Sequence, residues 1–476
     1  MYQVDSEDAN FLFLENTDSP THISLVYLYD QASLDDSVVR FTHILQHIRN
    51  RLNSAPVFCH KIQRTPADFD YPYWVDDDQF DLEFHVRHLA LPKPGDWRQF
   101  CIQIARLHSR PLDMNKPLWE LYVIEGLDKL TGFSPGSFAL YFKVHHCAMD
   151  EFTALELVES LHESSPNPRQ HERPPQQIAH LPATAPPLPE MLARGVINNS
   201  FKTIRLCYQS VVNFRTVSKI MTRMSIRLAH RLVSGETLSG NPETRFGGQL
   251  TASRVFEGGF YSRTILDDYV SQISGATPTH AIAAICGEAM RLYLKAHDEL
   301  TETSLSALLE VNVRNAGAHA LAGNRIAIRQ ILLNTDIEYP LSRLQAIVAT
   351  NQTLHSMEET ELTSFKLRSL YENIPAPLLA LMGKRSNRHR SFNRQLMHGG
   401  NCGIAEIQGS KDPLYLLGAQ LVGFTSVTPL YSGCGLMFTA SAYCDRVGIT
   451  FTSDRSMMPD PEFMRECLDA AFNTIG

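Results

Sequence analysis

A proline-rich segment divides this chain of 476 residues into two long parts. Residues 163–189 contain eight prolines and few large apolar side chains, a composition typical of an extended and exposed linker. A chain of this length is also too long for one ordinary hydrophobic core. We therefore predict a first lobe over residues 1–165, a linker over residues 166–190, and a second lobe over residues 241–476.

A basic segment with helical spacing lies between the two expected lobes, over residues 191–240. From Met191 to Ser234 it carries eight lysine and arginine residues and no aspartate or glutamate, with apolar residues interleaved. A basic amphipathic helix of this kind suits an anionic membrane surface. A solvated basic helix that packs on its own domain would show the same pattern, so both interpretations stay open. The first of them predicts peripheral contact with a membrane or a lipid droplet.

Composition limits the classes of function that this chain can have. A formal net charge of −8 argues against general binding of nucleic acid. The first residues lack the basic and apolar stretches of a signal peptide, and the nine scattered cysteines are most simply reduced thiols. The chain contains no run of about 18 apolar residues. We therefore expect a cytoplasmic protein, either free or peripheral at the inner membrane or at lipid inclusions.

The strongest candidate for chemistry is a histidine pair that follows an apolar run. Residues 138–144 read as a buried strand, and His145, His146 and, four residues later, Asp150 come directly after it. Catalytic groups are often placed where a rigid strand meets a loop, and an imidazole can take and return a proton near pH 7. Paired histidines at a strand end are, however, more often structural or surface residues.

Alternation along the strand gives the two histidines different surroundings. Neighbouring side chains on a strand point to opposite faces, so one histidine is a chemical candidate and the other supports it. For the same reason the pair cannot easily bind one metal ion, and the chain has neither an HExxH nor a CxxC motif. We therefore expect no metal site. A helix from Asp150 to about residue 162, with Asp150 near its N-cap, should follow the pair.

Several further motifs occur in one consistent order along the chain, and together they resemble one family. The chain is similar to bacterial wax ester synthases/acyl-CoA:diacylglycerol acyltransferases over about residues 6 to 465. Besides the HHxxxD motif of residues 145–150, the matching segments are the PLWE of residues 117–120, FDLEFHVRH of residues 80–88, RLHS of residues 106–109, GNRI of residues 323–326, and the C-terminal blocks at residues 413–416, 418–419, 454–455 and 459–460.

The resemblance implies a fold, an activity and roles for individual residues. The fold would be α/β, with two chloramphenicol acetyltransferase-like lobes, mixed and mostly antiparallel sheets, and a channel between the lobes. The activity would be acyl-CoA-dependent esterification of a long-chain fatty alcohol or diacylglycerol, with acyl-CoA as substrate and no cofactor. His146 would be the general base, His145 its support, and Asp150 a structural carboxylate. Substrate-binding positions would be Pro117, Leu118, Trp119, Glu151, Thr279, His280 and Asn324.

Three departures from the family pattern surround the retained base. Glu151 replaces the glycine that ends the motif, Thr279 and His280 replace an Asn-Asp pair, and residues 401–404 replace an Asn-Val-Pro-Gly segment. Glycine is used where the backbone needs a positive φ or where another group comes close. Two alternatives therefore accompany the enzyme prediction: a divergent lipid-binding relative with weak or lost catalysis, and acyl transfer to a different acceptor.

Overall fold

The computed structural model describes most of the chain, including both expected lobes. The predicted site residue Asn324, most of the predicted linker, and most of the basic segment beyond residue 214 lie outside the described residues. The described residues are 2–32, 39–51, 58–130, 133–166, 184–214, 241–312, 326–355, 372–388 and 400–476, with the single positions 218, 222, 225 and 370.

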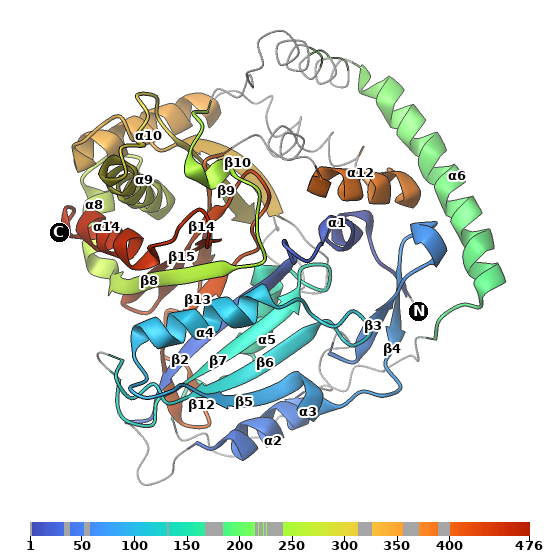
Figure 1. Cartoon of the computed structure of the whole chain (residues 1–476), viewed down its shortest axis with the longest axis horizontal. Coiled ribbons are helices and arrows are strands. Elements are labelled where there is room, and N and C mark those ends of the chain that lie inside the picture. The colour runs from blue at the N-terminus through green and yellow to red at the C-terminus, as the bar shows by residue number, and fades with distance from the viewer. Residues whose placement is uncertain are drawn as a thin grey trace.

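The first large sheet has six strands in the order β12-β13-β2-β7-β6-β5 (Figure 1). All neighbours are antiparallel except β5 and β6, which are parallel. The predicted histidine strand is confirmed as β7, and it lies between β2 and β6 near the middle of the sheet. The strands are β2 (His22–Asp30), β5 (Val86–Ala90), β6 (Trp119–Glu125), β7 (Phe138–His145), β12 (Tyr415–Leu416) and β13 (Ala419–Val427).

The second large sheet also has six strands, in the order β10-β9-β11-β14-β15-β8. Strand β11 runs parallel to both of its neighbours, and the other pairs are antiparallel. The mixed, mostly antiparallel α/β fold expected from the sequence is confirmed. The strands are β8 (Arg254–Ser262), β9 (Ser306–Asn312), β10 (Ile326–Leu332), β11 (Cys402–Gln408), β14 (Leu436–Tyr443) and β15 (Arg446–Asp454).

Helices cover both faces of the first sheet. On β7, Phe142 and Val144 pack with α2 and α5, whereas Tyr141 packs on the opposite face with α4. Burial on both faces explains why this strand reads as a continuous apolar run and not as an alternating one. The helices are α1 (Ser6–Leu14), α2 (Phe41–Arg51), α3 (Leu82–His85), α4 (Trp97–Ser109), α5 (Glu151–Glu159), α6 (Leu188–Val212), α8 (Arg263–Ser271), α9 (Pro278–Ala296), α10 (Pro340–His355), α12 (Ala376–Arg388) and α14 (Pro461–Asn473).

The second lobe as predicted, residues 241–476, does not keep all its strands in one sheet. Strands β12 and β13 come from this part of the chain but extend the first sheet, with Phe424 opposite Tyr27 on β2. The pairing satisfies the backbone groups along β2 that would otherwise form an open sheet edge. Helix α12 likewise packs against α1, where Gly383 approaches the carbonyl oxygen of Phe13. The two lobes therefore interlock, and the boundary at residue 241 stays a prediction.

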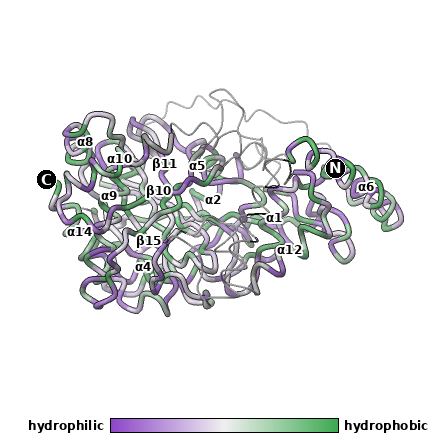
Figure 2. Tube along the Cα trace, turned by 90° about the horizontal axis from the view of Figure 1, so that it is seen from above, coloured by the Kyte–Doolittle hydropathy of each residue, from purple (hydrophilic) through white to green (hydrophobic). Residues whose placement is uncertain are grey.

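Helix α6 forms an arm along one side of the molecule (Figure 1), and Figure 2 shows it at the end opposite the C-terminus. It begins at Leu188, inside the predicted linker, and includes the described start of the basic segment. A small sheet supports its first half; its strands are β1 (Tyr2–Gln3), β3 (His60–Gln63) and β4 (Tyr73–Asp76) in the order β1-β4-β3. Within the described part of the chain, no helix combines the length and the apolar character that crossing a membrane requires.

Candidate active site

The histidine motif is held at the end of β7 by both neighbouring strands. The backbone amide of His145 donates to the carbonyl oxygen of Leu118, just before β6, at 2.9 Å. The amide of His146 donates to the carbonyl oxygen of Thr21, just before β2, at 3.0 Å. Because both partners belong to a central region of the sheet, the position of the motif is fixed by backbone pairing.

His145 is fully buried, and both of its ring nitrogens are occupied. Nδ1 accepts a hydrogen bond from the amide of Cys147 at 3.0 Å. Nε2 lies 3.0 Å from Thr21 Oγ1 and 3.3 Å from Glu15 Oε2. Since Nδ1 accepts, the neutral ring carries its proton on Nε2 and donates it to the Thr21 hydroxyl, which itself donates to the carbonyl oxygen of Phe11 at 2.9 Å. The role of support expected for His145 stays a prediction.

His146 has a different environment, made by α1. Its ring stacks on Phe11 with the ring centroids 4.0 Å apart and the planes 4° from parallel, and the residue is 5% exposed. Sequence reasoning did not identify Phe11, Glu15 or Thr21, which surround the two histidines. These residues precede the motif by more than 120 positions and belong to no motif of their own, so the sequence contained no signal for them.

Asp150 acts as the cap of α5, as expected. Its Oδ1 accepts from the amide of Thr153 at 2.9 Å and from the Thr153 hydroxyl at 2.8 Å. A carboxylate at this position satisfies an orphan amide and interacts favourably with the positive end of the helix. The contacts support the structural role predicted for Asp150.

Glu151, which replaces the motif glycine, points into the protein. It is 2% exposed, and Ser426 on β13 donates to its Oε1 at 3.5 Å. Burial, together with the nearby carboxyls of Glu310 on β9 and Asp150, holds the pKa of Glu151 well above its usual range. Burial also raises the pKa of Glu310 to about 7. Two carboxyl groups from different lobes therefore interact beside the first turn of α5, and each disfavours the ionised form of the other.

The PLWE segment braces the histidine strand. Leu118 and Trp119 are buried, and the Trp119 indole donates to the carbonyl oxygen of Phe58 at 3.0 Å and stacks on His85. Glu120 forms an ion pair with the buried Lys143 of β7 at 3.3 Å. These contacts hold the segment in place beside the histidine strand. The substrate-binding role expected for Pro117, Leu118 and Trp119 stays a prediction.

Thr279 and His280 lie at the start of α9. The Thr279 hydroxyl donates to Glu406 Oε2 at 2.5 Å. Nδ1 of His280 accepts from the amide of Thr277, which completes a capping box, and Asn351 lies 2.7 Å from His280 Nε2. These contacts cap α9 and join its start to β11 and α10. The substrate-binding role of both residues also stays a prediction. Among the described residues, no cluster of histidine, cysteine and carboxylate side chains could hold a metal ion.

Similarity to solved structures defines the class of fold. The chain is similar to a wax ester synthase/diacylglycerol acyltransferase from Marinobacter aquaeolei VT8, with a TM-score of 0.69 and 20% identity over 100% of this chain and 98% of that one. It is also similar to a trichothecene 15-O-acetyltransferase from Fusarium sporotrichioides, with a TM-score of 0.60 and 10% identity over 99% and 95% of the two chains. The two-lobed fold is thus that of chloramphenicol acetyltransferase-like acyltransferases.

Sequence comparison defines the family within that class. The catalytic domain of wax ester synthase/diacylglycerol acyltransferases matches residues 4–268, and the C-terminal domain of the same family matches residues 322–476. The chain belongs to this family and is an O-acyltransferase that uses acyl-CoA. Proteins named as diacylglycerol O-acyltransferases are similar over nearly their full length: one from Mycobacterium bovis is 28% identical over 98% of this chain and 97% of its own, and one from Mycobacterium tuberculosis H37Rv is 25% identical over 95% and 92%.

Proposed function

We propose that His146 is the general base for esterification of a long-chain fatty alcohol or diacylglycerol. The observation that carries this proposal is the place of His146 directly after β7. Its backbone is fixed by pairing with Thr21, and its ring lies stacked on Phe11. Both ring nitrogens of His145 bond to neighbouring protein groups, which suits a support. The rigid placement of the His146 ring at the end of the strand supports its role as the base.

The reaction needs one proton carrier and no covalent enzyme intermediate. His146 accepts the proton of the acceptor hydroxyl while the hydroxyl oxygen forms a bond to the thioester carbonyl carbon. The resulting tetrahedral oxyanion collapses, the carbon–sulfur bond breaks, and the CoA thiolate recovers the proton from the imidazolium. A thiol with a pKa near 8.5 is a fair leaving group, so a nucleophilic serine is unnecessary.

The test is a thiol-release assay with palmitoyl-CoA and either hexadecanol or dioleoylglycerol. His146→Ala should lower the rate by about 10²- to 10⁴-fold, the usual contribution of a general base. His145→Ala should leave more activity, provided that circular dichroism shows a folded protein. His43→Ala is the matched control, because His43 lies exposed on α2. A folded and inactive His145 variant beside a fully active His146 variant would reverse the assignment.

We further propose that α6 docks on an anionic lipid surface. One side of the helix faces the first lobe: Gly195 lies against Phe69, and Asn198 and Asn199 bond to Asp70 and the Phe69 carbonyl. The side away from these contacts carries an apolar stripe with exposures of 54% to 75%. The stripe consists of Ile197, Phe201, Ile204, Tyr208 and Val211.

The spacing and surroundings of the stripe support a lipid partner. Its members follow one another at intervals of four and three residues, so they share one face of the helix. A contiguous apolar face that is left exposed marks an interaction site, and the exposed Arg205 lies beside it. The substrates and products of the family are lipids, and a helix lying in the interface would bring the enzyme to them. Of the eight cations in the basic segment, Arg215, Lys219, Arg223, Arg227 and Arg231 lie outside the described residues.

A further inference from the structure

The turn between α1 and β2, residues 15–21, connects both histidines to the second lobe. Asn16 organises the turn, since its Oδ1 accepts from the amides of Asp18 and Ser19 at 2.8 and 2.9 Å. Toward the active site, Glu15 and Thr21 contact the His145 ring, and the Thr21 carbonyl accepts from the His146 amide. A displacement of this turn would therefore move the supports of both histidines together.

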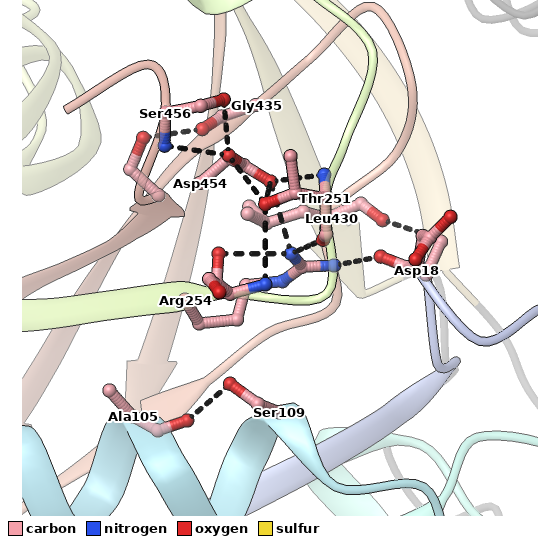
Figure 3. A network of polar contacts seen from close by, with 12 residues as sticks. Asp18, Ala105, Ser109, Thr251, Arg254, Leu430, Gly435, Asp454 and Ser456 are labelled. Carbon is pink, nitrogen blue, oxygen red and sulfur yellow. Dashed lines mark hydrogen bonds and ion pairs between the residues drawn. The ribbon is translucent and has the colours of Figure 1, made fainter.

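On its other side the turn is attached to the second lobe at two points (Figure 3). Arg254 at the start of β8 donates through Nη2 to the carbonyl oxygen of Asp18. Ser19 Oγ donates to the carbonyl oxygen of Leu430 at 2.8 Å, in the connection between β13 and β14. Both contacts are made by backbone carbonyls and by side chains with little exposure, so solvent does not compete with them.

Arg254 is itself held by a buried carboxylate. Its side chain is 2% exposed and lies 3.2 Å from Oδ2 of the fully buried Asp454, its neighbour in the β8–β15 register. Asp454 also accepts from the amides of Thr251 and Ser456 at 2.5 and 2.9 Å. Breaking one side of a buried pair leaves an uncompensated charge. Asp454 therefore compensates the guanidinium charge and holds the side chain in contact with the turn.

We propose that the Arg254–Asp454 pair is a positioning device that sets the geometry of His145 and His146 from the second lobe. Arg254 bonds to the Asp18 carbonyl, and Asp18 belongs to the same short turn as Glu15 and Thr21. Glu15 and Thr21 in turn contact the two histidines. The inference rests on the proposed role of His146 as base. A device of this kind acts on the chemical step, whereas an ion pair that only stabilises the fold would leave the turnover of folded enzyme unchanged.

The test compares kcat and KM of folded variants. The double variant Arg254→Met with Asp454→Leu removes the contact to Asp18 and leaves no buried charge unpaired. We expect kcat to fall about 10- to 100-fold, since a small misplacement of a reacting group costs up to about 10² in rate, while KM for palmitoyl-CoA stays within about twofold. Arg98→Ala is the matched control: it breaks another contact between the lobes, Arg98 to Glu462 at 2.8 Å, but not one to the turn, and should keep the wild-type kcat.

A mutant cycle with Thr21→Val separates positioning from general weakening. If both changes act through the turn, the combined loss in kcat is smaller than the product of the separate losses. Additive losses, or a double variant with wild-type kcat, would overturn the inference. Ser19→Ala keeps the ion pair intact and replaces the double variant in the cycle if that protein does not fold. An active His146→Ala variant would instead refute the base assignment, so the two failures are distinguishable.

Discussion

At the scale of single residues, the main departure from the family motif is a buried glutamate with a raised pKa. A glutamate beside the base would be expected to stabilise the imidazolium. Burial and the neighbouring carboxyls keep the pKa of Glu151 well above its usual range, which favours its neutral form and weakens that effect on His146. What Glu151 changes is the space beside the motif and the contact between α5 and the second lobe, through Ser426.

This protonation predicts a pH dependence of stability. The folded protein binds more protons than the unfolded chain between the ordinary pKa of glutamate, 4.5, and the raised values in the fold, so the free energy of unfolding falls as pH rises through that window. Glu151→Gln removes the second ionisable group and should make the melting temperature fall less between pH 5 and 8, by a few °C. Differential scanning calorimetry at both pH values checks this, with the exposed Glu156→Gln on the same helix as control. If the melting temperature fell equally between pH 5 and 8 in all three proteins, the carboxyl pair would not be the cause of this pH dependence.

At the scale of elements, the local sequence pattern predicted the histidine strand and the helix after it, but not the elements that pack around them. The apolar run of β7 and the cap at Asp150 each depend on residues that are adjacent in the sequence, so both could be predicted. Phe11 and Thr21 reach the motif only because β2 pairs with β7, and β13 joins the same sheet from almost 400 positions further along. Such long-range pairings cannot be read from hydrophobic periodicity, because the sequence pattern of a strand does not show which distant strand pairs with it.

The stripe on α6 gives a prediction at the same scale. The protein should float with vesicles that contain phosphatidylglycerol and bind less to pure phosphatidylcholine, and high salt should weaken the binding because the Debye length shortens. Phe201→Ser with Ile204→Ser should reduce binding at least several-fold, since about 1.5–3 kcal/mol is associated with burial of each such side chain. Leu192→Ser with Val196→Ser is the control, because these exposed residues lie off the stripe. Loss of binding in both variants alike would count against a single docking face.

At the scale of the whole molecule, the two lobes are joined by elements that the second half of the chain contributes to the first lobe. It supplies β12 and β13 to the first sheet and α12 to the surface of α1. Helix α6, which comes from the segment between the lobes, lies against Phe69 next to the small sheet. The contacts of Arg254 and Ser19 also join the second lobe directly to the turn of residues 15–21. The proline-rich segment suggested two separable lobes, but the lobes share a sheet, and groups from both of them contact the turn beside the histidines.

Interlocking predicts how the protein behaves when its chain is cut. A site-specific protease sequence inserted within residues 167–183 should give two fragments that co-elute in size-exclusion chromatography and separate only in denaturant. If the fragments parted, β2 would lose the partner that faces it through Phe424 and Tyr27, and both apolar surfaces would meet water. The cut protein should keep the thiol-release activity, because the turn, the histidines and the Arg254–Asp454 pair remain assembled. Phe424→Asp should weaken the complex, since it places a charge in the shared core. Two independently folded fragments would mean that β12 and β13 contribute little to holding the two lobes together.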